Sequence, residues 1–352
     1  MKLNALAVGD LHLGGLKFLN GFIQDPDDYI YKSLDDVVVY AKEHSIKTVI
    51  LLGDIFDNPY PSQEDHKRLF KYLLASGLDW YIISGNHDVD LEAGDNPVNS
   101  LLMPEFYTSE MKKSIHIYTK PRLIKIAGVR VCFLPWPHSQ SLTKKPCLNV
   151  AHITLSKARS DAGRVLEGRK IRRNPNHYWT IGDLHTKQKY SDRVHYPGNL
   201  YQKTFGESLP KGFSHLIVKE TGGELLVDDR WIPVEPPFSL VQLAIDSLED
   251  LDKVEDLNRN KPTFYRLKVT SPEVVLPSKF RENHPHVLSV EYPRNRVKVE
   301  VEGKIVNIKG TQPPLKGLRA RLETFGLSKR QINMAIRYSK RKLKELTSEK
   351  GD

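Results

Sequence analysis

KTVILLGDIFD, residues 47–57, joins an unbroken apolar run to two aspartates, Asp54 and Asp57, through a single glycine. Short apolar runs that end in a glycine turn are typical of buried strands, and acidic residues directly after such a run lie at the carboxyl end of the strand. Similar runs lie on both sides of this one. We predict strands over Leu3–Val8, Lys47–Leu52, Trp80–Ile83, Val129–Leu134, Leu148–Ala151 and Tyr178–Ile181.

The segments between the first three of these strands carry apolar residues at helical spacing. Ile30, Leu34 and Val37 recur every three or four residues, and so do Leu69 and Leu73. Such spacing predicts amphipathic helices that cover a sheet. Strands that alternate with helices in this way indicate βαβ units and an α/β fold.

The pattern changes after Pro210. A Thr-Gly-Gly turn at 221–223 lies between strand-like runs, and Pro236-Pro237 closes the segment, which predicts an antiparallel meander. The predicted strands of the meander are Phe213–Lys219, Leu225–Val227 and Trp231–Val234.

A small α+β domain is predicted beyond the two prolines, with a helix followed by three strands. These elements are Leu240–Leu257, Phe264–Val269, Val287–Tyr292 and Val297–Val301. Ser328 and Gln331 then form a capping-box pattern ahead of a last helical stretch. We therefore predict three parts, residues 1–237, 238–309 and 310–352.

The composition is that of a globular protein: 352 residues, of which 39% are apolar and 27% charged. These values exclude collagen, mucin and long disordered chains. No apolar run approaches the ~18 residues of a membrane span, and the N-terminus shows no signal-peptide pattern, so we expect an intracellular, cytoplasmic protein with no membrane association. Cys132 and Cys147 both lie in apolar runs and are expected to be buried thiols.

The net charge of +10 is unevenly distributed. Residues 311–352 hold eleven Lys and Arg against four Asp and Glu, so this tail alone carries +7. A second basic stretch follows His152 and contains Lys157, Arg159, Arg164, Arg169, Lys170, Arg172 and Arg173. Basic segments of this kind bind polyanions or acidic partners, although each could also be a solvated surface.

Polar residues that bind metals or move protons follow nearly every predicted strand of the first part. They are Asp10, His12, Asp54, Asp57, Asn86, His87, Asp88, His152, Asp183 and His185. Each residue alone is more often part of an exposed turn than of a site. In an open α/β sheet, however, the carboxyl ends of the strands meet in one crevice. The ordered set therefore predicts a single convergent site.

Carboxylate, imidazole and amide ligands without thiolate favour divalent ions such as manganese, iron or zinc. The ligands are too many for one tetrahedral ion, so two ions with a bridging carboxylate fit better. A two-metal site activates a water and stabilises the attacking and leaving oxygens of a phosphoryl group. The predicted reaction is phosphoester hydrolysis.

Five ordered motifs resemble those of the calcineurin-like metallophosphoesterase superfamily over about residues 1–205. They are G-D-L-H (9–12), G-D-I-F-D (53–57), G-N-H-D (85–88), A-H (151–152) and G-D-L-H (182–185). Y-P-G-N at 196–199 and F-G-E at 205–207 further resemble the SbcD-type DNA double-strand-break repair nucleases, the meiotic-recombination-eleven group. The resemblance implies a four-layer sandwich, two mixed sheets flanked by helices, followed by a DNA-binding capping domain.

The same resemblance implies roles for the strand-end residues. One metal ion would be held by Asp10, His12, Asp54 and His185, and the other by Asp54, Asn86, His152 and Asp183, with Asp54 as the bridge. His87 would face the scissile phosphate, Asp88 would orient the His87 ring, and Asp57 would support them. Arg169, Lys170, Arg172, Arg173, Tyr196 and Asn199 are the predicted DNA contacts.

One position departs from the family pattern, because Asp183 stands where the family usually has the first histidine of G-H-x-H. A carboxylate adds negative charge, which favours harder metals and lowers Lewis acidity. Two consequences are compatible with this substitution. The enzyme could remain active with an altered metal preference, or the second metal site could bind its ion weakly.

The resemblance implies a nuclease that uses two divalent ions, Mn²⁺ first among Mn²⁺, Mg²⁺, Fe²⁺ and Zn²⁺. It would act on DNA as a 3′–5′ exonuclease and single-strand endonuclease in a bacterial or phage-infected cell. The chain would form a homodimer, and an SbcC-type coiled-coil ATPase would dock on the basic helical tail. A phosphodiesterase or phosphatase of the same superfamily, and a DNA-binding scaffold with a weakened site, are the alternatives.

Overall fold

A computed structural model describes most of the chain in two compact units. The described residues are 1–91, 98–102, 108–161, 163–172, 174–207, 210–258, 260–271, 274–277, 280–292, 296–301 and 304–309, with Lys329 and Asn333. The first unit comprises Met1–Leu240 and Arg259–Pro262, and the second comprises Val241–Asn258 and Thr263–Asp352. The predicted tail, 310–352, lies outside the described residues apart from these two isolated positions.

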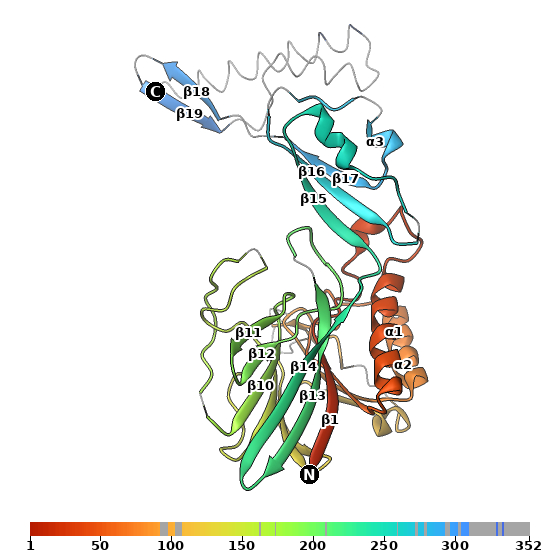
Figure 1. Ribbon diagram of the computed structural model, residues 1–352, viewed down its shortest axis with the longest axis vertical. Helices are drawn as coiled ribbons and strands as arrows, with labels where there is room; N and C mark the ends of the chain where they lie inside the picture. Colours follow the sequence, from red (N-terminus) through yellow and green to blue (C-terminus); the bar gives the residue numbers. More distant parts are fainter. Residues whose placement is uncertain are drawn as a thin grey trace. The chain divides into compact units, whose positions relative to one another are not determined.

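A six-stranded mixed sheet, in the order β14-β13-β1-β2-β3-β6, forms one half of the first unit (Figure 1). Its strands are β1 (Lys2–Val8), β2 (Thr48–Leu51), β3 (Asp79–Ile83), β6 (Ile115–Tyr118), β13 (Lys211–Thr221) and β14 (Glu224–Val234). The strands from β1 to β6 are parallel, and β13 pairs with β1 in the antiparallel direction. The predicted strands at 3–8, 47–52 and 80–83 are therefore confirmed.

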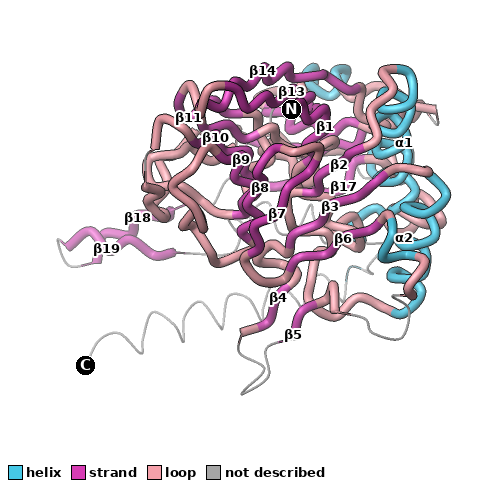
Figure 2. The backbone as a smooth tube through the Cα atoms, turned by 90° about the horizontal axis from the view of Figure 1, so that it is seen from below, coloured by secondary structure: helices cyan, strands magenta, loops and turns pink. Residues whose placement is uncertain are grey.

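A second six-stranded sheet, in the order β11-β12-β10-β9-β8-β7, forms the other half (Figure 2). Its strands are β7 (Arg122–Ile126), β8 (Val129–Leu134), β9 (Cys147–His152), β10 (His177–Gly182), β11 (Gln188–Ser191) and β12 (Val194–Tyr196). The central strands β8, β9, β10 and β12 are parallel, so the ends of β9 and β10 lie on the same edge of the sheet.

Two helices, α1 (Asp27–Glu43) and α2 (Gln63–Ser76), lie against the first sheet (Figures 1 and 2). The sequence starts α2 at Ser62, whose hydroxyl accepts from the Asp65 amide in a capping box, and ends it at Gly77, whose left-handed backbone suits glycine. Smaller elements are two 3-10 turns and a short hairpin. They are Lys17–Leu19, Met111–Lys113, β4 (Val89–Asp90) and β5 (Val98–Asn99).

Buried apolar side chains of both sheets meet in one core, including Ala5 and Ile50 from the first sheet and Val131 and Val150 from the second. The two mixed sheets confirm the predicted sandwich. On the other face of the second sheet, Trp179 packs with Leu155 and other residues of the loop after β9. In the described residues this loop takes the place of the fourth, helical layer, because it supplies the apolar side chains that the sheet must bury.

The predicted meander is a single hairpin. Leu225–Val227 and Trp231–Val234 both belong to β14, which pairs with β13 along its whole length. The polar residues between the two runs resemble a turn in sequence, but Asp229 is held within the strand by hydrogen bonds from Tyr178 and His195.

The second unit contains a three-stranded sheet and a two-stranded hairpin. Its elements are β15 (Ser239–Ile245), a 3-10 helix (Leu248–Lys253), β16 (Thr263–Val269), α3 (Phe280–Asn283), β17 (Val287–Glu291), β18 (Arg296–Val301) and β19 (Lys304–Lys309). The helix predicted over Leu240–Leu257 is wrong. Alternating exposure makes Ser239–Ile245 a strand, and the Ser247–Asp250 capping box starts only a short helix.

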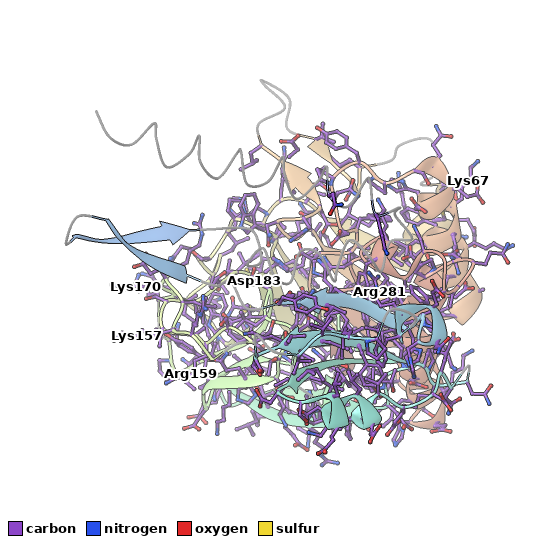
Figure 3. The ribbon with its side chains drawn as sticks, turned by 90° about the horizontal axis from the view of Figure 1, so that it is seen from above. Lys67, Lys157, Arg159, Lys170, Asp183 and Arg281 are labelled. Carbon is purple, nitrogen blue, oxygen red and sulfur yellow. The ribbon has the colours of Figure 1, made fainter. Side chains whose placement is uncertain are left out.

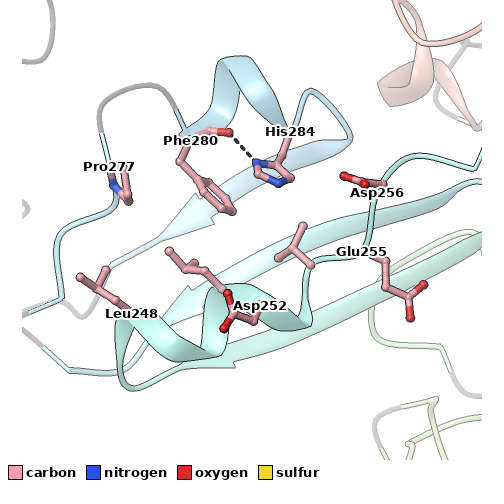
Figure 4. A pocket seen from close by; sticks show the side chains of 9 residues that line it. Leu248, Asp252, Glu255, Asp256, Pro277, Phe280 and His284 are labelled. Carbon is pink, nitrogen blue, oxygen red and sulfur yellow. Dashed lines mark hydrogen bonds between the residues drawn. The ribbon is translucent and has the colours of Figure 1, made fainter.

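A shallow pocket of about 580 Å³ lies in this unit beside α3 and the 3-10 helix (Figure 4). Leu251, Val254 and Phe280 contribute apolar side chains, and Asp252 and Glu255 contribute carboxylates.

In the described part of the chain, no helix is both long and apolar enough to cross a membrane.

Candidate metal centre

The loops at the carboxyl ends of five strands converge, as the sequence predicts. Asp10 and His12 follow β1, Asp54 and Asp57 follow β2, Asn86 and His87 follow β3, His152 ends β9, and Asp183 and His185 follow β10. Hydrogen bonds and ion pairs connect residues from both sheets, so the site lies where the two halves of the sandwich meet.

His152 lies at the centre of the buried half of the site. Its Nδ1 donates to the Leu52 carbonyl at 2.7 Å, which directs Nε2 toward the oxygens of the site. Nε2 lies 2.9 Å from Asn86 Oδ1 and 3.4 Å from Asp54 Oδ1. Asp10, Asp54 and His152 offer ligand atoms that all lie within 4.8 Å of one another. This group joins Asp10 and His152, which the resemblance assigns to different ions, through Asp54, the residue that it assigns as the bridge.

His12 and His185 form the second half of the site, with their Nε2 atoms 3.1 Å apart. His185 Nδ1 donates to Glu207 Oε1 at 2.9 Å, and His12 Nδ1 lies 3.3 Å from Asp57 Oδ1. The Glu207 carboxylate fixes the tautomer of His185, so that the His185 Nε2 lone pair faces His12 Nε2. The Lys203 ammonium donates to His12 Nδ1 at 3.0 Å, so the proton of the neutral His12 ring lies on Nε2 and is shared with His185. A metal ion bound between the two Nε2 atoms would displace this proton.

The backbone at the ligands is strained. His12 and Asp54 both have φ of +48°, and Asp183 has φ of +98°. Residues other than glycine rarely adopt positive φ values. The neighbouring glycines are required for packing, because a Cβ on Gly85 would lie 2.1 Å from Asp54 Oδ1. Strain of this kind concentrates at functional sites.

Burial and mutual charge shift the pKa values of the ligands in opposite directions. Burial raises the pKa of Asp10 to about 6, although His152 opposes the shift. Burial also raises the pKa of Asp54, but the nearby His152 and His12 more than offset it and hold that pKa below its usual range. His12 is buried without enough compensation, so its pKa falls to about 4. Burial also lowers the pKa values of His152 and His185, but the neighbouring carboxylates more than offset it and raise both. A metal ion that binds these two imidazoles would therefore displace a proton.

These observations fit a pair of divalent ions. The buried carboxylates of Asp10 and Asp54 lie beside the His152 imidazole, and further oxygen donors come from Asn86 and Asp183. Asp183 Oδ1 lies 3.9 Å from His152 Nε2, and Thr154 Oγ1 donates a short hydrogen bond to Asp183 Oδ2. The mixed oxygen and nitrogen donor set suits Mn²⁺ and related ions.

The His87 ring lies beside this centre and is partly exposed. Its Nδ1 donates to the Asp57 carbonyl at 2.9 Å, and its ring lies edge-on to His12 with centroids 4.7 Å apart. The structure therefore corrects the prediction that Asp88 orients the His87 ring. The buried Asp88 carboxylate instead accepts from the amides of Ile55, Phe56 and Gly85, so it fixes the loops that carry Asp54 and Asn86.

A buried charge network, not predicted from the sequence, holds His185. Glu207 accepts from His185 and, at 2.7 Å, from the Lys211 ammonium, which also donates to Asn199 Oδ1 at 2.8 Å. Burial raises the pKa of Glu207, but His185 and Lys211 lower it to about 2. The F-G-E motif at 205–207 marks Glu207 as a candidate residue, whereas no sequence motif marks Lys203 or Lys211.

The structure does not support Tyr196 and Asn199 as DNA contacts. Tyr196 is 1% exposed and its hydroxyl bonds the backbone of Ile153 and Leu155, while Asn199 is fully buried against Lys211. Both side chains position the loops of the site. Arg169, Lys170 and Arg172 are exposed, and Arg173 lies outside the described residues.

Residues 3–140 match the sequence model of the calcineurin-like phosphoesterase family. The match supports the superfamily that the motifs indicate, and it covers the ligands from Asp10 to Asn86. His152, Asp183 and His185 lie beyond it and join the site through the second sheet. The match and the ligand clusters together fit a metal-dependent phosphoesterase, a hydrolase that uses divalent ions.

Proposed function

We propose that the protein is an SbcD-type nuclease that hydrolyses DNA phosphodiesters at a two-metal site formed by Asp10, His12, Asp54, Asn86, His152, Asp183 and His185. When bound, two divalent ions would supply an activated water and neutralise the charge that develops on the phosphoryl oxygens. His87, partly exposed beside the ligands, is the group in position to donate a proton to the leaving oxygen.

The basic loop after β9 is the observation that favours DNA as the substrate. This loop, residues 153–172, begins directly after His152, and Thr154 bonds Asp183. The Arg169 amide donates to the Thr154 carbonyl at 2.8 Å, so a basic residue is held against the base of the loop next to the site. Lys157, Arg159 and Lys170 lie on the same loop at one side of the first unit (Figure 3).

Exposed cations that extend from a phosphoesterase site bind a polyanionic backbone without sequence specificity. A small phosphoester has no further phosphates to contact such a loop. The charges on the loop therefore favour a nucleic acid over a nucleotide or a phosphoprotein as the substrate.

The test compares two substrates in the same variants. End-labelled double- and single-stranded DNA reports the nuclease, and bis-p-nitrophenyl phosphate reports the bare phosphodiesterase, each with Mn²⁺ or Mg²⁺. Charge reversal by R169E/K170E should lower DNA cleavage about a hundredfold at physiological salt and leave hydrolysis of the small diester within about twofold. K67E/K71E, an equal reversal on the exposed face of α2, is the matched control and should leave both activities unchanged.

His87→Gln should lower both activities by about 10²–10⁴-fold while the Mn²⁺ stoichiometry stays unchanged, because His87 contributes a proton and no metal ligand. Hydrolysis of the small diester or of a phosphoprotein without DNA cleavage would refute the nuclease and favour the phosphodiesterase or phosphatase alternative. Specific DNA binding without any hydrolysis would favour the scaffold.

We also propose the partners that the resemblance implies, a second copy of this chain and an SbcC-type coiled-coil ATPase. The basic segment 310–352 is the proposed docking segment for the ATPase, and it lies outside the described residues apart from Lys329 and Asn333. Light scattering of the chain alone tests the dimer. Co-purification with the ATPase, lost when Lys340, Arg341 and Lys342 are replaced by glutamate, tests the docking segment.

A further inference from the structure

Lys203 reaches the metal centre from the turn that connects β12 and β13. Its ammonium lies 2.5 Å from Asp57 Oδ1 and 3.0 Å from His12 Nδ1, and its side chain is 15% exposed. The turn is fixed at this residue, because the Lys203 amide donates to Glu207 Oε2 at 3.1 Å. Lys203 therefore adds a fixed positive charge to a site that otherwise contains carboxylates and imidazoles.

The carboxylate of Asp57 lies where it would repel a phosphoester. Asp57 Oδ1 is 3.9 Å from His87 Nδ1, the ring that faces the proposed substrate. The same Oδ1 lies 2.5 Å from the Lys203 ammonium, the geometry of an ion pair with a carboxylate. Without a nearby cation, this charge would oppose the approach of an anionic substrate to His87.

Asp183, a proposed ligand where the resembled family usually has a histidine, increases the repulsion of an anionic substrate. Asp10, Asp54, Asp57 and Asp183 place four carboxylates around the centre, one more than with the histidine that the resembling family usually has at 183. Beside His185, Glu207 is balanced by Lys211, and Asp161 adds a further negative charge. Two divalent ions therefore leave no excess positive charge for a phosphodiester anion. The Lys203 ammonium restores one positive charge on the face of the site that contains His87.

We propose that Lys203 is a positioning residue that pairs with Asp57 and offsets the added charge of Asp183, so that the metal-loaded site accepts an anionic phosphoester beside His87. Asp57 Oδ1 and the Lys203 ammonium both lie beside His12 Nδ1, at 3.3 Å and 3.0 Å, so the pair also holds the His12 ring with Nε2 directed to the centre. The proposal rests on the phosphoesterase activity proposed above and extends it to the binding of the substrate anion.

The first arm of the test measures binding and does not depend on turnover. Calorimetry follows Mn²⁺ binding to the full metal-free chain and then binding of inorganic phosphate to the Mn²⁺-loaded chain. Lys203→Met should weaken phosphate about tenfold and leave Mn²⁺ affinity equal or higher, because the substitution removes a cation from the site. Lys189→Met, which removes an exposed lysine paired with Asp192, is the matched control and should change neither affinity.

The second arm measures hydrolysis of bis-p-nitrophenyl phosphate at saturating Mn²⁺. Lys203→Met should raise KM about tenfold with a smaller effect on kcat, and Lys203→Arg should restore most of the loss because it keeps the charge. D57N/K203M removes both charges of the pair and should have a lower KM than Lys203→Met alone. The double variant also tests the pairing if Lys203→Met folds poorly.

Several results would overturn the proposal. One is a loss of Mn²⁺ affinity in Lys203→Met that parallels the loss of phosphate binding, since this would give Lys203 a purely structural role. Phosphate affinity and KM that are both unchanged in Lys203→Met would also overturn the proposal. If the wild type binds Mn²⁺ and phosphate but hydrolyses no diester, the proposed function fails while the first arm still decides the role of Lys203.

Discussion

At the scale of single residues, the identity of residue 183 determines the chemistry of one half of the centre. In the proposed centre, Asp183 is a shorter and harder ligand than the imidazole that the resemblance implies at this position, and Thr154 holds the carboxylate by a hydrogen bond. Hard oxygen ligands favour Mg²⁺ relative to softer ions. The metal preference should therefore depend on this residue.

Asp183→His should lower the ratio of the Mg²⁺-supported rate to the Mn²⁺-supported rate, because an imidazole binds the softer ion better. The measurement is diester hydrolysis across a concentration series of each ion. Thr154→Val, which removes only the hydrogen bond to Asp183, serves as the control and should change the ratio less. An identical ratio in wild type and Asp183→His would show that residue 183 does not ligate a metal ion.

At the scale of elements, the turn between β12 and β13 and the first residue of β13 hold His185 in place through Glu207 and Lys211. Glu207 and Lys211 are both buried, and Glu207 fixes the tautomer of His185. Removal of one partner of a buried ion pair is costly because the other charge remains without compensation. The turn therefore contributes to stability and to metal binding through the same residues.

Glu207→Gln should lower the free energy of unfolding by about 3–5 kcal/mol, because it leaves the Lys211 ammonium buried without a counter-charge. It should also weaken Mn²⁺ binding about 10–100-fold through His185. Urea unfolding and calorimetry measure the two effects. E207Q/K211M removes both charges and should recover stability but not metal affinity; recovery of neither, or of both, would contradict these roles.

The carboxylate of Asp229 on β14, whose side chain is 6% exposed, gives the sandwich a pH dependence away from the centre. Burial raises the pKa of Asp229, but hydrogen bonds from His195, Tyr178 and Ser214 lower it below its usual value. A lowered pKa in the folded state means that the ionised group stabilises the fold above the unfolded pKa of about 4, and that this stabilisation is lost as the pH falls.

Asp229→Asn should therefore cost about 1–2 kcal/mol of unfolding free energy at pH 7, with the difference from wild type shrinking below about pH 4. Urea unfolding between pH 3 and pH 8 measures this. Asp228→Asn, at an exposed neighbouring position on β14, should stay within about 0.5 kcal/mol of wild type throughout. A constant difference between wild type and Asp229→Asn at all pH values would contradict the assignment.

At the scale of the whole molecule, local patterns predicted the α/β strands and the strand-end residues, and the family resemblance implied the two-sheet sandwich. Asp54 and Asn86 follow short apolar runs, and parallel strands bring such positions to one edge. Lys203 and Lys211 escaped prediction because their partners lie far away in the sequence or inside a turn. Leu240–Leu257 was misread because a strand and a short 3-10 helix in succession gave an apolar spacing like that of one helix.

The central claim is that the convergent strand ends form a metal-dependent phosphoesterase site, and metal reconstitution tests it most directly. The full chain is stripped with EDTA and titrated with Mn²⁺ while hydrolysis of bis-p-nitrophenyl phosphate and bound metal are measured together. We predict no hydrolysis without metal, activity that rises to a plateau at two ions per chain, and loss of both in Asp54→Ala. Hydrolysis that persists in EDTA, or no hydrolysis with two bound ions, would contradict the account.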